Sequence, residues 1–282
     1  MALIKSISGI RGTIGGKPGD TLSPIDIVKF TAAFGSTLIE KAIDNAGPVT
    51  VVIGRDGRIS GEMVNGLVIN TLLGLGIDVI DLGWSTTPTV EIATKSEGAN
   101  GGIIITASHN PKEWNALKLL NSDGEFIDAA WGERILQLAD ECAFTFAPVD
   151  KLGKLSVNNE YLQKHIDLVL AYPLVDKQAI EKQQFKVVVD CINSTGSLVL
   201  PQLLKALGIE DIIVLNGEVN GRFAHNPEPL PQHLNGLSNE VVKQKAHFGI
   251  AVDPDVDRLC FVCEDGSMFG EEYTLVAVAD YI

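Results

Sequence analysis

Three carboxylates stand close together late in the chain, directly after a short apolar run. Asp253, Asp255 and Asp257 occupy alternate positions, and Arg258 follows them. Carboxylates at this spacing repel one another unless a cation or water separates them, and hard oxygen ligands suit Mg²⁺ or Ca²⁺. Because residues 248–252 are apolar enough for a buried strand, we predict that this strand leads into a loop that binds a divalent cation. A solvated acidic turn is the simpler alternative.

The carboxylate loop has two further interpretations. Asp253 and Glu264 are spaced like the first and last ligands of an EF-hand, but Arg258 occupies the position that requires glycine and the flanking segments look like strands. The EF-hand interpretation therefore fails. A strand that ends in Asp-x-Asp is also similar to the phosphatases of the haloacid-dehalogenase type, in which the first aspartate is the nucleophile. That hypothesis gives Asp253 a catalytic role, and it stays open.

A second polar loop follows another apolar run. The apolar residues 103–105 lead into Thr-Ala-Ser-His-Asn-Pro at residues 106–111, a segment rich in small polar groups. We expect a helical turn here, because Pro111 suits the first position of a helix and the backbone N–H groups of such a turn favour a phosphate. Ser108 is the candidate nucleophile, although a serine in this place is often only a helix cap. A serine and a carboxylate loop at equivalent strand ends suit phosphoryl transfer, in which a cation offsets the charge of the transferred group.

The composition is that of a globular protein. The chain has 282 residues, of which 45% are hydrophobic and 21% are charged, and this length is enough for two domains of ordinary size. The formal net charge of -14 argues against a broad nucleic-acid surface, because such surfaces need many Lys and Arg side chains. Any phosphate must then be bound locally. No apolar run is long enough to span a membrane and no secretory signal opens the sequence, so we expect a cytoplasmic protein without a membrane partner.

A weak internal repeat indicates the architecture. Residues 51–83 and residues 187–217 share an order of apolar strand, helical stretch and second strand, with the helical stretches at residues 62–75 and 197–207. A further strand follows each copy. Strands that alternate with helices at these lengths form βαβ units with parallel strands. We therefore predict an α/β fold with two similar α/β domains, each a mixed, mostly parallel sheet with helices on both faces, plus the start of a third domain.

The domain boundaries follow from local composition. Proline, glycine and asparagine interrupt the pattern near residues 148–158, before a helical stretch at residues 160–171. The last residues look like the opening of another helix. We predict a first domain over residues 1–153 that contains the serine loop, a second over residues 154–267 that contains the metal loop, and the start of a truncated third over residues 268–282.

Four motifs along the chain form a recognisable set: Ser-Gly-Ile-Arg-Gly at residues 8–12, Gly-Arg-Asp-Gly-Arg-Ile-Ser-Gly at residues 54–61, Thr-Ala-Ser-His-Asn-Pro at residues 106–111 and Asp-Pro-Asp-Val-Asp-Arg at residues 253–258. Together they resemble the α-D-phosphohexomutases, a family that includes phosphoglucomutase, phosphomannomutase and phosphoglucosamine mutase. They occur in the family's order, and the resemblance covers essentially the whole chain. Pro254 departs from the pattern, since the family more often has glycine there. It should stiffen the loop without removing a ligand.

The resemblance implies a mutase reaction. Ser108 would carry a phosphate, and Mg²⁺ would be held by an oxygen of this phosphoserine and by Asp253, Asp255 and Asp257. The phosphoserine would transfer its phosphoryl group to a hexose phosphate substrate, and the resulting 1,6-bisphosphate would turn within the site and return its other phosphate to the serine. Phosphate would thereby move between O1 and O6 of the sugar, with glucose 1,6-bisphosphate or an equivalent hexose bisphosphate as the activator.

The resemblance also implies roles for basic side chains. Arg11, Lys118 and Arg258 would surround the transferring group with positive charge. Lys118 matches a family position thought to serve as general acid or base, although a solvated lysine is the simpler interpretation. His109 would orient the phosphoserine or assist proton transfer, although a loop histidine is more often an ordinary hydrogen-bonding residue.

Other implications concern support of the site and the extent of the protein. Arg55 and Arg58 would support the site, and residues 221–229 correspond to a family loop near the active cleft whose role here is open. The family has four domains, so we expect the N-terminal half of a mutase, inactive or weakly active by itself, without the residues that choose among glucose, mannose and glucosamine phosphates. The alternatives are a metal-dependent phosphatase with an aspartate nucleophile and a non-catalytic module that binds a sugar phosphate.

Overall fold

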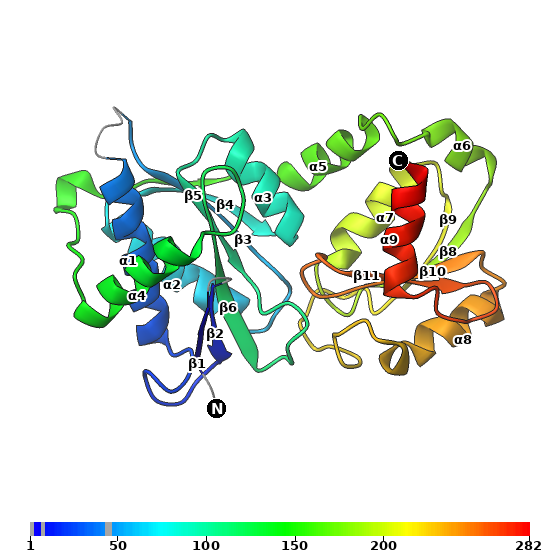
Figure 1. The fold of residues 1–282 in the computed structure, drawn as a ribbon, viewed down its shortest axis with the longest axis horizontal. Coiled ribbons are helices and arrows are strands. Elements are labelled where there is room, and N and C mark those ends of the chain that lie inside the picture. The colour runs from blue at the N-terminus through cyan, green and yellow to red at the C-terminus, as the bar shows by residue number, and fades with distance from the viewer. Residues whose placement is uncertain (1–2, 7–8, 43–46) are drawn as a thin grey trace. The chain divides into compact units, whose positions relative to one another are not determined.

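The structure of the protein is a computed structural model that describes residues 3–6, 9–42 and 47–282, so Ser8 of the first motif lies outside the described residues. The chain divides into two units (Figure 1). Residues 1–107 and 112–161 form the first unit, and residues 108–111 and 162–282 form the second. The short serine loop at 108–111 therefore belongs to the second unit, although the strands on either side of it belong to the first.

The first unit contains a seven-stranded mixed sheet. Strands β5, β3, β4 and β7 run parallel to their neighbours in that group, and β6, β2 and β1 extend the sheet beyond β5 through antiparallel pairs. In sheet order the strands are β1 (Leu3–Ser6), β2 (Gly9–Thr13), β6 (Trp114–Leu120), β5 (Gly101–Ile105), β3 (Thr50–Arg55), β4 (Asp78–Trp84) and β7 (Leu155–Val157).

Helices cover both faces of this sheet. Successive side chains of a strand point to opposite faces, and β3 shows this directly: Val51 and Ile53 pack into a core with α1, α2 and α4, whereas Val52 packs with α3 on the other face. The helices are α1 (Pro24–Lys41), α2 (Gly61–Gly74), α3 (Thr87–Ser96) and α4 (Ala129–Glu141), with the short 3₁₀ helix η1 (Val149–Lys151) after them.

The second unit repeats this plan around a smaller sheet. Its strand order is β11, β10, β8 and β9, and only the pair β10–β11 is antiparallel. Helices α5 and α7 pack on one face and α8 packs on the other. The strands are β8 (Lys186–Asp190), β9 (Asp211–Leu215), β10 (Phe248–Val252) and β11 (Leu259–Cys263). The helices are α5 (Tyr161–Leu170), α6 (Lys177–Lys182), α7 (Gly196–Ala206), η2 (Pro231–His233), α8 (Asn235–Gln244) and α9 (Glu271–Tyr281).

The predicted fold class is confirmed, and one local expectation is wrong. Two α/β units with mixed sheets and helices on both faces are present. Where a helical turn was expected at Pro111, the structure has no helix: turns at residues 108–109 and 112–113 lead directly into β6. The cause is a long-range one: β6 pairs with β2 and β5 on either side, and these partners compete successfully with any local helical preference.

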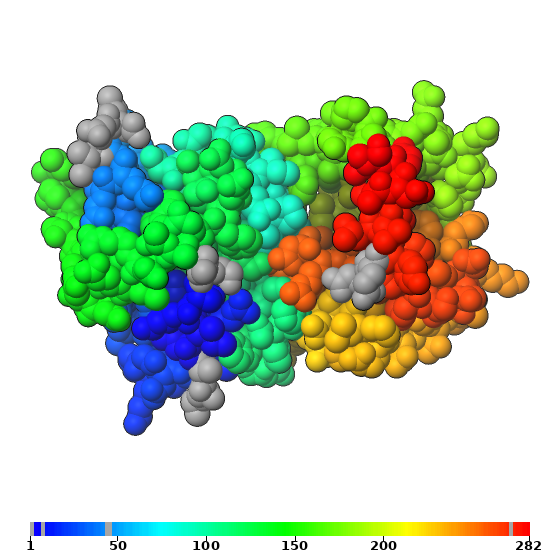
Figure 2. All heavy atoms as spheres, viewed as in Figure 1, coloured from blue at the N-terminus to red at the C-terminus, as the bar shows by residue number. Residues whose placement is uncertain are grey.

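Helix α9 exposes large apolar side chains to solvent. Figure 2 shows this helix, in red, on the surface of its unit. Its large apolar side chains Tyr273, Leu275, Val276, Val278 and Tyr281 are all exposed. The described side chains of α9 therefore belong to neither core cluster of the second unit. Within the described part of the chain, no helix combines the length and apolar character needed to cross a membrane.

Candidate active site

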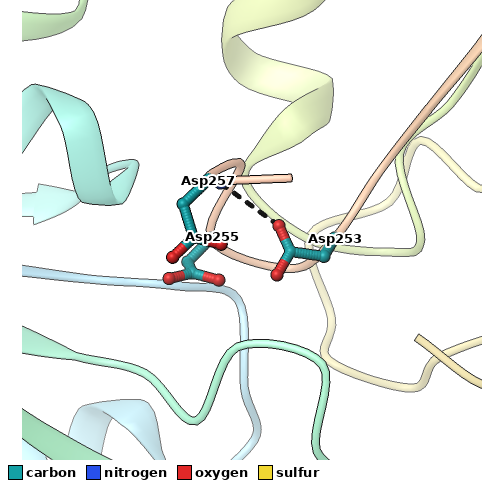
Figure 3. Close-up of side chains that lie close together, drawn as sticks. All are labelled: Asp253, Asp255 and Asp257. Atoms are coloured by element: carbon teal, nitrogen blue, oxygen red, sulfur yellow. Dashed lines mark hydrogen bonds between the residues drawn. The ribbon is translucent and has the colours of Figure 1, made fainter. Parts of the chain in front are cut away.

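The three carboxylates lie in the loop that joins β10 to β11. These strands pair antiparallel, so that Val252 and Leu259 face each other at the base of the loop. Asp253, Asp255 and Asp257 each bring one carboxylate oxygen within 4.8 Å of the others. Figure 3 shows their side chains gathered at this turn. Asp253 and Asp255 are buried and Asp257 is exposed, so the cluster has one side open to solvent.

Asp253 organises the backbone of the loop. Its Oδ1 atom accepts hydrogen bonds from the backbone N–H groups of Asp257 and Arg258, both at 3.2 Å, and the first of these bonds is drawn in Figure 3. Its backbone carbonyl accepts a further bond of 3.2 Å from the N–H of Val256. The loop therefore folds back on its own first residue, which brings the following carboxylates toward Asp253.

The electrostatics of the loop favour a bound cation. Burial holds the pKa of Asp253 well above its usual range, and the charges of Asp255 and Asp257 raise it further, while the hydrogen bond from Ser108 lowers it in part. A divalent cation would remove this repulsion. Three carboxylates form a hard oxygen donor set, and two of them are shielded from water, so the residues present fit Mg²⁺ or Ca²⁺.

Ser108 meets the carboxylate loop directly. Its Oγ atom donates a hydrogen bond of 2.7 Å to Oδ2 of Asp253, and both residues are buried. The same oxygen lies 3.2 Å from Nδ1 of His109. The backbone of Ser108 is left-handed, with φ of 49°, a conformation that is uncommon for a non-glycine residue and that collects at functional sites. Within the second unit, the structure thus joins the candidate nucleophile, a histidine and the candidate metal ligands.

A buried ion pair in the first unit ties together the two strand ends that flank the serine loop. Arg58 Nε lies 3.0 Å from Asp56 Oδ2, and both side chains have no exposed surface. Thr106, at the end of β5, donates to the same carboxylate oxygen at 2.7 Å. Arg58 Nη1 donates to the carbonyl of Trp114, the first residue of β6, at 2.9 Å. The pair therefore connects the residues before and after the loop that carries Ser108.

Three other basic residues that were predicted for the site lie on strands of the first unit. Lys118 lies on β6, opposite Ile104 of β5, and its Nζ atom is 3.4 Å from Oγ1 of Thr87. Arg11 lies on β2, opposite Ala116 of β6. Arg55, at the end of β3, is half-buried and its guanidinium stacks over the ring of Trp84 at 5.4 Å. Burial lowers the pKa of Arg55, although the nearby charges of Asp81, Glu62 and Asp56 oppose this effect.

Two sets of buried hydrogen-bonding residues in the second unit, here called anchors, were not predicted from the sequence. Asp190, at the end of β8, is buried and its Oδ2 atom lies 3.0 Å from Nε2 of His225, in the loop whose role was open. The same loop also approaches the metal loop, since Glu228 Oε1 lies 3.9 Å from Nη1 of Arg258. The only signal in the sequence was that Asp190 ends an apolar run, as Asp253 does.

The second anchor consists of Ser194 and Thr195, in the turn before α7. Both hydroxyl groups donate to the backbone carbonyl of Pro254, inside the carboxylate loop, at 2.6 Å and 2.9 Å. In sequence, a Ser-Thr-Gly segment before a helix indicates only a helix start. Nothing local reveals that these hydroxyls reach a loop some sixty positions later.

Comparison with known proteins identifies the class to which this fold and site belong. The description "Phosphoglucomutase/phosphomannomutase, alpha/beta/alpha domain I" matches residues 3–145, and the corresponding domain II description matches residues 160–266. These two matches cover most of the chain. The chain therefore belongs to the phosphoglucomutase/phosphomannomutase family, the α-D-phosphohexomutases, as its four motifs predicted.

Individual relatives agree with this assignment. A "Phosphoglucomutase/phosphomannomutase" of Thermococcus kodakarensis is 36% identical over 275 residues, which are 97% of this chain and 58% of the relative. A "Probable phosphoglucosamine mutase" of Methanopyrus kandleri is 34% identical over 272 residues, 96% of this chain and 56% of the relative. The crystal structure of a phosphoglucomutase/phosphomannomutase family protein from Burkholderia thailandensis superimposes with a TM-score of 0.81 at 26% identity, covering 98% of this chain and 59% of that one. The chain thus spans a little over half the length of these relatives.

Proposed function

We propose that this chain is the phosphoserine-bearing and cation-binding half of an α-D-phosphohexomutase. The observation that carries the proposal is the 2.7 Å hydrogen bond from Ser108 Oγ to Asp253, inside a cluster of three carboxylates. A serine oxygen held against a cation-binding carboxylate suits phosphoryl transfer, because the cation offsets charge where the phosphoryl group is carried. The names of the relatives support a hexose phosphate as the substrate class.

In the proposed reaction, Ser108 Oγ carries a phosphoryl group and gives it to a hydroxyl oxygen of a hexose monophosphate. The bond between Oγ and phosphorus breaks as the bond between phosphorus and the sugar oxygen forms; the sugar hydroxyl loses its proton to a base, and the released Oγ takes up a proton to become a hydroxyl again. The resulting 1,6-bisphosphate turns and returns its other phosphate to Oγ, so that phosphate moves between O1 and O6. Asp253, Asp255, Asp257 and a phosphoserine oxygen would hold Mg²⁺, which would supply positive charge beside the transferred group.

The neighbouring side chains have proposed roles in this scheme. His109 Nδ1, at 3.2 Å from Ser108 Oγ, orients the serine and can hold a proton at that oxygen. Lys118 is the proposed general acid or base, and Arg11 and Arg258 are proposed to stabilise charge on the phosphoryl oxygens; these three roles rest on the family resemblance. Arg58 is proposed to support the strand ends beside the serine loop, and its hydrogen bond to the Trp114 carbonyl favours this role. Arg55 is proposed as a further support.

The phosphatase alternative receives no support from the geometry of Asp253. As a nucleophile, Asp253 would need a carboxylate oxygen directed at the phosphorus atom of a substrate. Its Oδ2 atom accepts the hydrogen bond from Ser108, and its Oδ1 atom accepts from two backbone N–H groups of the loop. This pattern favours a carboxylate that structures the loop and binds a cation, with Ser108 as the phosphoryl carrier.

The extent of the protein is also part of the proposal. The first domain is proposed to cover residues 1–153, the second residues 154–267, and residues 268–282 are proposed to open a third. The relatives' greater length supports the view that sugar selection lies in parts of the protein beyond these residues. A cytoplasmic location and glucose 1,6-bisphosphate, or an equivalent bisphosphate, as the molecule that loads Ser108 complete the proposal.

The test is phosphate loading of Ser108. The purified chain is incubated with glucose 1,6-bisphosphate and Mg²⁺, and intact mass with phosphopeptide mapping locates any added phosphate. Ser108→Ala is the test variant, and Ser122→Ala, which removes an exposed serine on a surface turn, is the matched control. We expect one phosphate on Ser108 in the unaltered chain and in the control, and none in Ser108→Ala.

The contrary outcomes are distinct. A phosphate on Asp253 that persists in Ser108→Ala and is released by hydroxylamine would establish the phosphatase mechanism instead. Binding of the sugar phosphate without any phosphoprotein, in this chain and equally in a chain of the relatives' full length, would support the non-catalytic module and overturn the proposal.

A further inference from the structure

Two buried hydroxyl groups converge on a single carbonyl of the carboxylate loop. Ser194 Oγ donates to the Pro254 carbonyl at 2.6 Å, and Thr195 Oγ1 donates to the same oxygen at 2.9 Å. Both donors have no exposed surface. Pro254 is the residue between Asp253 and Asp255, so the carbonyl belongs to the peptide that connects the two buried carboxylates.

The hydrogen bonds to this carbonyl matter because they restrain a backbone rotation of Pro254. Each residue has only two soft backbone dihedrals, φ and ψ. The pyrrolidine ring restricts φ of Pro254 to a narrow range. The remaining dihedral, ψ, sets the direction of the carbonyl, and the hydroxyls of Ser194 and Thr195 hold that carbonyl in place. Both soft rotations of Pro254, the residue that connects Asp253 to Asp255, are therefore restricted.

The turn that carries the two hydroxyls is itself held against the loop. The Ser194 N–H donates to the carbonyl of Cys191 at 3.0 Å, which closes the turn. At Gly196, the first residue of α7, a Cβ atom would lie 2.7 Å from Cγ2 of Val252, the last residue of β10. The start of the helix thus packs directly on the strand that leads into Asp253, and only glycine allows this approach.

The second half of the loop has a different restraint. Val256, between Asp255 and Asp257, has φ of 61°, which is strained for a β-branched residue. The Asp253 carboxylate spans this residue by accepting from the N–H groups of Asp257 and Arg258. Asp253 thus restrains the later part of the loop. The hydrogen bonds described for the Pro254 carbonyl, between the first two carboxylates, come only from the hydroxyls of Ser194 and Thr195.

We propose that Ser194 and Thr195 are positioning residues for the cation: through the Pro254 carbonyl they set the separation of Asp253 and Asp255, and thereby the affinity for a divalent cation. The inference rests on the proposed cation-binding function of the loop. Neither hydroxyl is a proposed ligand. Mutating residues that orient metal ligands without binding the metal typically lowers metal affinity about 10- to 100-fold. We expect losses in this range for Ser194 and Thr195 variants.

The test measures cation binding by the chain itself, without an activity assay. Mg²⁺ is titrated by calorimetry, and Mn²⁺ is titrated by its electron paramagnetic resonance signal. Thr195→Val removes one hydroxyl while keeping the side-chain shape, and we expect it to weaken binding about tenfold. Combining it with Ser194→Ala should weaken binding up to about 100-fold. Thr195→Ser keeps a hydroxyl and should restore most of the affinity.

Two further variants serve as controls. Ser197→Ala removes a nearby hydroxyl at the start of α7, but this hydroxyl donates to the Ser194 carbonyl at 3.0 Å, so affinity should change less than about twofold. Asp255→Asn removes a proposed ligand and should abolish binding. If Asp255→Asn binds the cation as well as the unaltered chain, the cation-binding function of the loop is wrong, irrespective of the two hydroxyls.

A double-mutant cycle separates positioning from general destabilisation. Pro254→Gly frees φ of residue 254, so losing both hydroxyls in that background leaves neither φ nor ψ of residue 254 restrained. The double hydroxyl loss should therefore weaken binding by a larger factor in the Pro254→Gly background than in the chain that keeps proline. The positioning role is overturned if Asp255→Asn abolishes binding while Ser194→Ala with Thr195→Val binds within twofold of the unaltered chain. If that double variant does not fold, Thr195→Val decides by the same criterion, with circular dichroism confirming its fold.

Discussion

Replacing Arg58 by methionine tests how strongly the buried ion pair stabilises the first unit. Methionine keeps much of the side-chain volume but removes the charge, so Asp56 remains as a buried carboxylate without its cation. Removing one partner of such a pair costs about 3–5 kcal/mol of unfolding free energy. Two donors to Asp56 survive the change, the backbone N–H of residue 58 at 2.9 Å and the Thr106 hydroxyl at 2.7 Å. We therefore expect the lower end of the range, about 3 kcal/mol.

The three tryptophans of the chain make this measurement specific. Trp84, Trp114 and Trp131 all lie in the first unit, so the urea dependence of tryptophan fluorescence reports the unfolding of that unit alone. For domains of 150–250 residues, 1 kcal/mol corresponds to about 2–4 °C in Tm, so a loss of about 3 kcal/mol should lower Tm by about 6–12 °C.

The matched control is an ion pair on the surface of the same unit. Arg134 Nη2 lies 2.8 Å from Glu40 Oε1, and both side chains are more than two-fifths exposed. Because exposed ion pairs contribute little, Arg134→Met should leave the urea midpoint almost unchanged. If Arg58→Met shifts the midpoint no more than Arg134→Met does, the reasoning from burial is refuted for this pair.

Three further predictions concern the metal loop, a histidine and a glycine. Mg²⁺ at 100 times its Kd should stabilise the second unit by about 2.7 kcal/mol in thermal unfolding followed by circular dichroism, and Asp255→Asn, which should abolish binding, should remove this effect. Burial by itself lowers the pKa of His225, but hydrogen bonds to Asp190 and to the carbonyl of the next residue, with the Asp190 charge, raise it above its ordinary value of about 6.5. The protonated ring therefore stabilises the second unit at low pH, this contribution is lost as pH rises through the raised pKa, and His225→Gln should flatten that part of the Tm-versus-pH curve. In Gly153→Ala, the added Cβ would lie 1.9 Å from the carbonyl oxygen of Ile77, so the backbone must shift and tryptophan fluorescence should report a loss of about 1–3 kcal/mol; an unchanged urea midpoint would contradict this.

Local patterns predicted the repeating elements well. The helical stretches expected at residues 62–75 and 197–207 correspond to α2 (Gly61–Gly74) and α7 (Gly196–Ala206). The expected strand before the carboxylates is β10. These predictions succeeded because hydrophobic periodicity and glycine positions act within one element, where each residue's neighbours are adjacent in the chain.

The failures and omissions all involve long-range contacts. The segment after Pro111 is the strand β6 because β2 and β5 pair with it, and no property of the segment itself indicates those partners. The anchors Ser194 and Thr195 were missed for the same reason, since their acceptor lies in a different loop.

By itself, the sequence determined the family, the α/β class and the residue types of the candidate site, because the chemistry of such a site requires particular side chains at short spacings. Only the tertiary structure decided that Ser108 donates to Asp253, 145 positions later, and that two hydroxyls hold the carbonyl of Pro254. The physical reason is that periodicity specifies which face of an element is buried, whereas the partner of that face depends on strand pairing and close packing between distant segments.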